Sequence, residues 1–181
     1  MKKRILSLLI LLSAATATMA YNSILAKLVK TDYEGKADSL TKVFIKEFMN
    51  TSKGTFWVTP RGVNSSNTYI YWQQAHAIDV VIYAYERNLA AGNKTQANLY
   101  KNYVSKWFQN KGNNYSGGST GFENPYTDDM CWIALTLQRM GEVFNNNTYF
   151  STAKKLFDNG IMSRAKEDEK GLWLPWNTDN G

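Results

Sequence analysis

Residues 127–144 read TDDMCWIALTLQRMGEVF, and this segment of the 181-residue chain carries the strongest signal for its architecture. Its apolar residues cover nearly every direction around a helix axis, and they are Met130, Cys131, Trp132, Ile133, Ala134, Leu135 and Leu137. A helix that is apolar all round is buried on most of its sides. We therefore expect the helix over 127–144 in the core, with Trp132 as a core residue.

Four other segments show the spacing of amphipathic helices, which is about 3.6 residues per turn. They are residues 36–50, about 72–91, 94–110 and 148–161. Gly92 supplies the left-handed conformation at which helices often end, and Asn93 is a favoured cap for the helix that follows. The sequence shows no convincing long strand, so the predicted fold is all-α. In 36–50 the predicted buried face consists of Ala37, Leu40, Val43, Phe44 and Phe48.

The links between the predicted helices are alternately long and short. The long links, over 51–71, 111–126 and 166–181, are rich in aromatic residues and poor in charge. Because successive antiparallel helices place alternate links at opposite ends, we expect all three at one end, which is the candidate functional face. Helices 72–91 and 127–144 would form an inner layer and the others an outer layer. This pattern predicts a toroid of helix hairpins that five helices cannot close, so we expect a fragment of one.

The N-terminus has the features of a secretory signal peptide. Three basic residues over 2–4 precede an apolar run over 5–12 and small residues over 13–20. The apolar run is too short to span a bilayer, and no comparable run follows it. We expect cleavage after Ala20 and release into the periplasm or the medium, with a mature helical domain over 21–181.

Composition and charge exclude several kinds of partner. The chain is 44% hydrophobic and 20% charged, which is typical of a globular protein. Without residues 1–20, 18 basic and 15 acidic side chains would remain, a net charge of +3 with no basic run, which does not favour nucleic acid. With one cysteine, Cys131, and one histidine, His76, we expect no disulfide, no metal site and no cofactor. No obligate protein partner is evident.

The predicted inner helix over 127–144 begins with two adjacent acids, Asp128 and Asp129. A helix N-terminus stabilises a carboxylate, whereas two like charges in one site raise the proton affinity of the pair. One base and one acid can therefore coexist, and hydrolysis of a glycosidic bond needs this division. The alternative is that Asp128 caps the helix and Asp129 complements its dipole, and the dipeptide alone favours that alternative.

Residues near the pair have the composition of a glycan-binding cleft. Sugars present apolar CH faces and hydroxyl groups, which aromatic rings and amides bind. By itself His76 is more typical of a structural histidine, and Asp79 can simply pair with a neighbouring helix. The candidate substrate-binding residues are Trp57, Tyr71, Trp72, Gln73, Gln74, His76, Tyr126, Trp173 and Trp176.

Three segments together resemble glycoside hydrolase family 76, the endo-α-1,6-mannanases. They are YWQQAHAID at 71–79, ENPYTDDMCWIAL at 123–135 and GLWLPWN at 171–177. The resemblance implies an (α/α)6 barrel, of which this chain would be the N-terminal half, and a polysaccharide substrate, α-mannan. It also implies retaining cleavage of α-1,6-mannosidic bonds by the aspartate pair, and it adds Asn124 and Asn177 to the candidate binding residues.

The resemblance assigns Asp128 as nucleophile and Asp129 as general acid/base. A retaining mechanism asks for carboxyl groups ~5–5.5 Å apart, which neighbouring residues at a helix entry can satisfy if their side chains converge. Two other functions stay open. One is a helical module that binds glycans without cleaving them, and the other is a toroidal glycosidase or lyase for a different polysaccharide.

Overall fold

The computed structural model describes residues 33–63, 71–111 and 117–176. The predicted signal peptide and Asn177 therefore lie outside the described residues. The chain divides into two compact units, Met1–Leu40 and Thr41–Gly181. The described part of the first unit, 33–40, is helical, and the elements below belong to the second unit. No helix within the described residues has the length and apolarity needed to cross a membrane.

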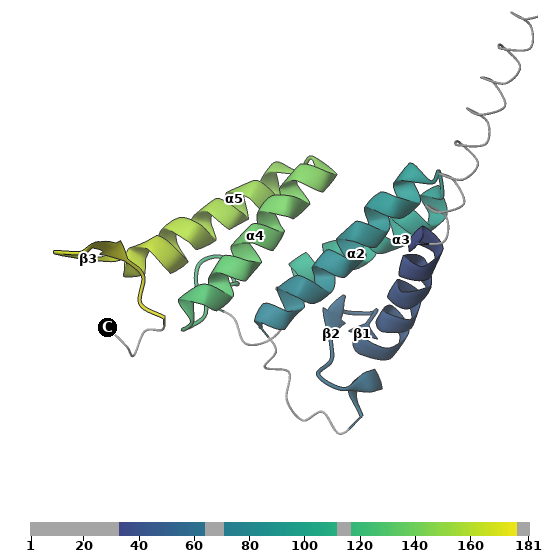
Figure 1. Ribbon diagram of the computed structural model, residues 1–181, viewed down its shortest axis with the longest axis horizontal. Coiled ribbons are helices and arrows are strands. Elements are labelled where there is room, and N and C mark those ends of the chain that lie inside the picture. The colour runs from purple at the N-terminus through teal and green to yellow at the C-terminus, as the bar shows by residue number, and fades with distance from the viewer. Residues whose placement is uncertain (1–32, 64–70, 112–116, 177–181) are drawn as a thin grey trace, which may run out of the picture. The chain divides into compact units, whose positions relative to one another are not determined.

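The second unit is built from helices and two short β-hairpins, one before α2 and one after the last helix (Figure 1). Helical residues 41–48 are followed by an antiparallel hairpin, which pairs β1 with β2, and by a 3-10 turn, η1. A second hairpin, of β3 with β4, follows the last helix. The elements in chain order are β1 (Met49–Asn50), β2 (Thr55–Phe56), η1 (Pro60–Gly62), α2 (Trp72–Ala90), α3 (Lys94–Gln109), α4 (Thr127–Phe144), α5 (Asn147–Lys155), the π-type η2 (Leu156–Ile161), η3 (Met162–Arg164), β3 (Lys166–Asp168) and β4 (Gly171–Trp173).

Helices α2 and α4 form the centre of this unit. Helix α2 packs against α3 and α4, and α4 packs against α5 and η2 (Figure 1). Both central helices carry fully buried side chains, whereas α3 and α5 each have an exposed polar face. Helices α2 and α4 therefore occupy the predicted central position, although α3 also carries fully buried side chains, among them Val104 and Trp107. The core residues that α2 and α4 supply are Ala75, Ile78, Val81, Ile82, Ala84, Met130, Ile133, Leu137 and Met140.

Local sequence explains where the helices begin and end. The Asn93 side chain accepts a hydrogen bond from the Gln96 N–H at the start of α3, as predicted, and Asn146 caps α5 in the same way through Thr148. Gly92, between α2 and α3, has φ of +76°, which glycine adopts without steric cost. Asparagine tolerates the same region, and Asn145 ends α4 with φ of +48°.

The three long links converge on the starts of α2 and α4. Each link contributes a backbone group that bonds to one of these helix starts, so the prediction that the long links gather at one end is confirmed. The bonds join Gln74 to Phe56, Tyr71 to Phe122 and Thr127 to Trp176.

The first predicted helix differs from the structure in its end and its buried face. The helix covers 33–48, because Met49 and Asn50 leave it to pair with β2. Leu40 and Val43 are 71% and 58% exposed, whereas Ile45 and Met49 are buried in the core. The expected stripe was therefore wrong at Leu40 and Val43, whereas Phe44 and Phe48 pack against the core as predicted. Both faces carry apolar residues, so periodicity alone did not distinguish them.

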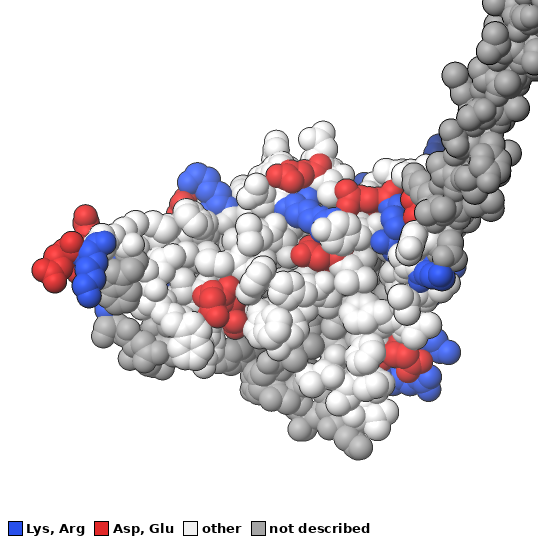
Figure 2. All heavy atoms as spheres, viewed as in Figure 1, with Lys and Arg blue, Asp and Glu red and all other residues white. Residues whose placement is uncertain are grey.

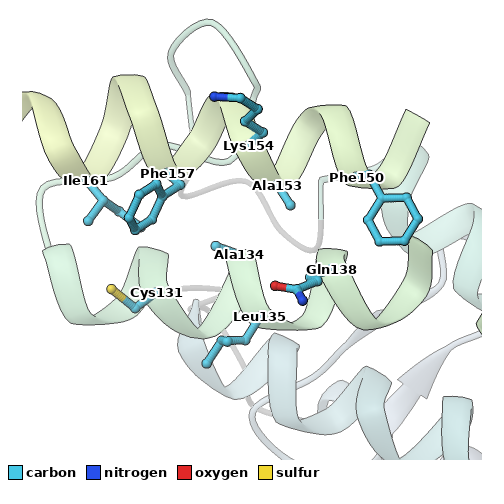
Figure 3. A pocket seen from close by; sticks show the side chains of 9 residues that line it. All are labelled: Cys131, Ala134, Leu135, Gln138, Phe150, Ala153, Lys154, Phe157 and Ile161. Carbon is cyan, nitrogen blue, oxygen red and sulfur yellow. The ribbon is translucent and has the colours of Figure 1, made fainter. Parts of the chain in front are cut away.

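Helix α4 is also less enclosed than its sequence predicted. Trp132 is 45% exposed and Leu135 is 59% exposed, so the expectation that Trp132 lies in the core was wrong. Leu135 lines an apolar groove of about 520 Å³ between α4 and the α5–η2 segment, into which Phe150 and Phe157 also project (Figure 3). The apolar residues around α4 therefore form two surfaces, one buried in the core and one open to solvent.

Candidate functional site

The two acids lie in the first turn of α4, where the end of the chain's described part approaches them. No side chain caps this helix start, and the backbone N–H of Thr127 instead donates to the carbonyl of Trp176, at 2.8 Å. Asp128 is exposed, while Asp129 is partly buried. The two carboxyl groups therefore occupy different environments on one helix turn.

Asn124 connects the loop before α4 to the second acid. Its side-chain Nδ2 donates to Oδ2 of Asp129 at 3.2 Å, and its Oδ1 accepts from the backbone N–H of Tyr126 at 2.9 Å. Asn124 is 5% exposed, so a ligand in solvent has little access to it. The structure therefore places this predicted binding residue behind Asp129, where it holds the carboxyl group.

The surroundings of Asp129 favour its protonated form. Burial raises the pKa of this carboxyl, the hydrogen bond from Asn124 lowers it, and the charge of Asp128 raises it again. The net direction of the pKa is upward. Of the two acids, Asp129 is thus the better candidate to hold a proton and deliver it to a leaving group.

An aromatic surface extends from the acids across to α2. Trp132 lies one helical turn after Asp128, and its ring centroid is 4.6 Å from that of His76. The His76 ring also contacts the Trp72 ring, with centroids 5.5 Å apart in an edge-on geometry. All three side chains are exposed. Sequence periodicity assigned Trp132 to the core and missed it as a site residue. Its position four residues after Asp128 was a usable signal, because residues four apart lie on the same face of a helix.

A polar network joins α2 to α4 one turn further along. Thr136 Oγ1 donates to Asp79 at 3.3 Å, and Arg139 bonds to Glu86 at 2.8 Å while its guanidinium stacks 3.4 Å from the Tyr83 ring centroid. Burial raises the pKa of Asp79, and Arg139, 4.0 Å away, opposes this shift. Asp79 therefore links two helices, as the structural alternative for this residue predicted.

Two of the predicted binding residues are instead held in the interior. Tyr71 is 3% exposed, and its hydroxyl donates to the carbonyl of Phe122. Burial, followed by the charges of Asp129 and Glu123, raises the Tyr71 pKa. Gln74 is 1% exposed, with Nε2 donating to the Phe56 carbonyl at 2.9 Å and Oε1 accepting from the Phe56 N–H at 3.0 Å. Both side chains hold the long links in place and are not available to a ligand.

Trp57 and Gln73 share a second groove with the aromatic surface. This groove has a volume of about 500 Å³ and also reaches Trp72 and His76. The Oε1 atom of Gln73 is buried without a hydrogen-bond partner, so a polar group remains unsatisfied here. The rest of the lining is apolar and consists of Phe44, Phe48, Phe56, Val58, Ala77 and Val80.

The last described residues bring one more aromatic pair to the start of α4. The ring centroids of Tyr126 and Trp176 are 5.2 Å apart, and Trp176 is 57% exposed. Trp173 belongs to β4. The structure therefore places Tyr126 and Trp176 next to the acids, as the sequence predicted.

The charge distribution around these elements is mixed. On the face drawn in Figure 2, Lys and Arg lie among Asp and Glu, and wide areas between them are uncharged. Within residues 33–63, 71–111 and 117–176, no three His, Cys, Asp or Glu side chains gather closely enough to hold a metal ion.

Comparison with known proteins identifies structural relatives. No family model matches the chain, and no curated protein matches it either. Among solved structures, it is similar to the GH76A α-1,6-mannanase from Salegentibacter sp. HEL1_6, with 26% sequence identity and a TM-score of 0.60. The match covers 81% of this chain and 39% of the mannanase.

Two further structures of the same Salegentibacter enzyme are also similar, and they cover the same shares of both chains. An inactive variant with two consecutive aspartates replaced by asparagine, in complex with α-1,6-mannotriose, has 24% identity and a TM-score of 0.57. An inactive variant with both aspartates replaced by alanine, in complex with α-1,6-mannotetrose, has 23% identity and a TM-score of 0.58. The chain thus has the helical fold of family 76 α/α-barrel enzymes and spans 39% of their length.

Proposed function

We propose that this protein is part of a glycoside hydrolase that cleaves α-1,6-mannosidic bonds in mannan. The observation that carries the proposal is the aspartate pair at the start of α4. One carboxyl is exposed, the other is partly buried with a raised pKa, and an exposed aromatic surface begins one turn away. The similarity to family 76 structures supports a fold of the glycosidase type.

The mechanism assigns a different task to each acid. Asp129, whose pKa is raised by burial, would protonate the leaving oxygen and then activate water. The exposed Asp128 would attack the anomeric carbon and form a covalent glycosyl intermediate, which the activated water hydrolyses with net retention. The solved mannanase supports a catalytic role for the pair as a whole, because its inactive variants have two consecutive aspartates replaced together.

The aromatic surface would bind the sugar. Trp72 and Trp132 are exposed indole rings on α2 and α4, and both contact His76 between them. Indole faces pack against the CH groups of a pyranose ring, while the imidazole supplies a polar partner for its hydroxyls. The inactive variants of the neighbour were solved with α-1,6-linked mannose oligomers, and we propose the same class of ligand here.

We further propose that the protein acts outside the cytoplasm. A polysaccharide such as mannan is too large to enter a cell intact, and residues 1–20 have the sequence features of a cleaved signal peptide. Export would bring the enzyme to its substrate.

The test compares the protein with its Asp128→Asn and Asp129→Asn variants. We expect each substitution to reduce the release of reducing ends from linear α-1,6-mannan by on the order of 100- to 10,000-fold. Asp158→Asn is the matched control, because Asp158 is exposed and pairs with Lys154, and it should keep full activity. Equal activity in all four proteins would refute the assignment.

The second candidate function is glycan binding without cleavage, and experiment can distinguish it from the first. The chain spans 39% of the neighbour's length, and the exposed rings of Trp72 and Trp132 can bind a sugar whether or not its linkage is cleaved. Binding of α-1,6-mannotriose by the unaltered protein, measured by calorimetry, with no release of reducing ends would establish this alternative. Absence of both binding and hydrolysis would reject both functions for this chain.

A further inference from the structure

Arg164 reaches from the end of the last helix to the loop that precedes the two acids. It lies in η3, which is 40 residues beyond Asn124 in the sequence. Its Nη2 donates to the carbonyl of Asn124 at 2.8 Å, and its Nη1 donates to the carbonyl of Pro125 at 2.9 Å. One guanidinium group therefore holds two consecutive carbonyls of this loop.

The same loop residue carries the hydrogen bond to Asp129. The backbone of Asn124 is fixed by Arg164, and the side chain of Asn124 bonds to the Tyr126 N–H and to Asp129. With its backbone and its side-chain oxygen both fixed, the amide Nδ2 of Asn124 has one direction available, which is toward the carboxyl of Asp129. The contacts thus form a chain from Arg164 through Asn124 to Asp129.

We propose that Arg164 is a positioning residue for the aspartate pair, acting through Asn124. Its catalytic meaning depends on the function proposed above, whereas the positioning itself does not. An arginine is needed because its planar guanidinium offers several N–H groups in a fixed fork, which can bond to two adjacent carbonyls at once. A lysine has the same charge but presents a single nitrogen.

Other groups around Asp129 do not provide this hold. Asp128 comes from the same helix turn and repels Asp129, and Tyr71 at the start of α2 donates its hydroxyl to Phe122. Glu123 accepts from the Ser119 hydroxyl and the Thr120 N–H. Among the described residues, Asn124 donates the side-chain hydrogen bond that lowers the Asp129 pKa.

The experiment measures the pKa of Asp129 by carbon-13 NMR titration of aspartate-labelled protein. In Arg164→Lys the loop loses its two-carbonyl hold, so the Asn124 amide leaves Asp129 and we expect its pKa to rise. Arg61→Lys is the matched control, because Arg61 also makes two bonds through its guanidinium, to Glu47, and it should leave the Asp129 pKa unchanged.

A double-mutant cycle identifies the route of the effect. Asn124→Leu removes the donor and should raise the Asp129 pKa by itself. Adding Arg164→Lys to Asn124→Leu should then produce no further rise, because Arg164 acts only through Asn124. If Asn124→Leu does not fold, Asn124→Ala replaces it, since alanine also lacks the donor and adds no charge beside Asp129.

Two results would overturn the proposal. One is an unchanged Asp129 pKa in Arg164→Lys, and the other is a rise in the double variant that equals the sum of the single ones. If the titration behaves as expected and the protein does not hydrolyse mannan, the positioning role stands and the proposed function fails. In an active protein, the basic limb of the pH profile of kcat/KM should move to higher pH in Arg164→Lys.

Discussion

The starts of α2 and α4 are alike in position and opposite in chemistry. Neither has a side-chain cap, and residues one turn into each helix are in contact through His76 and Trp132. The first turn of α2 has no acid, and Tyr71 and Gln74 bond inward to the backbone of two links. The first turn of α4 carries two carboxyl groups, Asp128 exposed to solvent and Asp129 partly buried against Asn124. The start of α2 therefore anchors the loops, and the start of α4 places its acids beside the surface that those loops form.

The largest expected effect is on stability, and it comes from Gln74, whose side chain bonds inward from the first turn of α2. Gln74→Leu removes both bonds to Phe56 and leaves a buried N–H and carbonyl without partners. We expect the free energy of unfolding to fall by about 3 kcal/mol, measured by urea denaturation. Gln138→Leu, at an exposed glutamine of α4, is the control and should change it little. Equal losses in both variants would contradict the anchoring role.

An intermediate effect is expected on the surface shared by the two helices. Trp132→Ala removes an exposed ring, so we expect roughly fivefold weaker binding of α-1,6-mannotriose, about 1 kcal/mol, with little loss of stability. Calorimetry and thermal denaturation measure the two quantities. Leu135→Ala removes another exposed apolar side chain of α4, which lines the separate groove of Figure 3, and should leave the affinity unchanged.

The smallest effect concerns stability and pH at the start of α4. Burial raises the Asp129 pKa in the fold, so the folded state prefers the protonated acid and loses stability as pH rises through that pKa. Asparagine cannot ionise, so Asp129→Asn should be slightly more stable than the unaltered protein at pH 7. This gain should vanish below the ordinary aspartate pKa of about 4, which urea denaturation at both pH values would show. A gain that persists at low pH would point to another cause.

The sequence predicted the helices well where local signals agreed. Periodicity, the Asn93 cap and Gly92 all indicated the α2–α3 turn, and that turn is present. The helix over 33–48 has apolar residues on more than one face, so the predicted buried side included the exposed Leu40 and Val43 beside Phe44 and Phe48, and it omitted the buried Ile45 and Met49. Which of two apolar faces is covered depends on the packing of distant segments, and a local pattern does not contain that information.

The candidate site was predicted by residue type, and less well by role. Asp128, Asp129, Tyr126 and Trp176 do lie together at the start of α4. Gln74 was expected to bind sugar because amides do so, and Asn124 because of the family resemblance, yet Gln74 bonds to the Phe56 backbone and Asn124 bonds to Asp129. Arg164 was missed because it bonds to carbonyls 40 residues away, and a bond to the backbone leaves no pattern in side-chain spacing.

The bond between the Thr127 N–H and the Trp176 carbonyl also has a consequence in time. A ribosome adds ~5–20 residues per second, so Trp176 is made several seconds after α4 has left the peptidyl transferase centre. Through that interval the Thr127 N–H, next to the two acids, lacks the carbonyl that it bonds to in the folded protein. The backbone contact at the acidic helix start therefore forms only after the 32 residues that follow Phe144, up to Trp176, have been added.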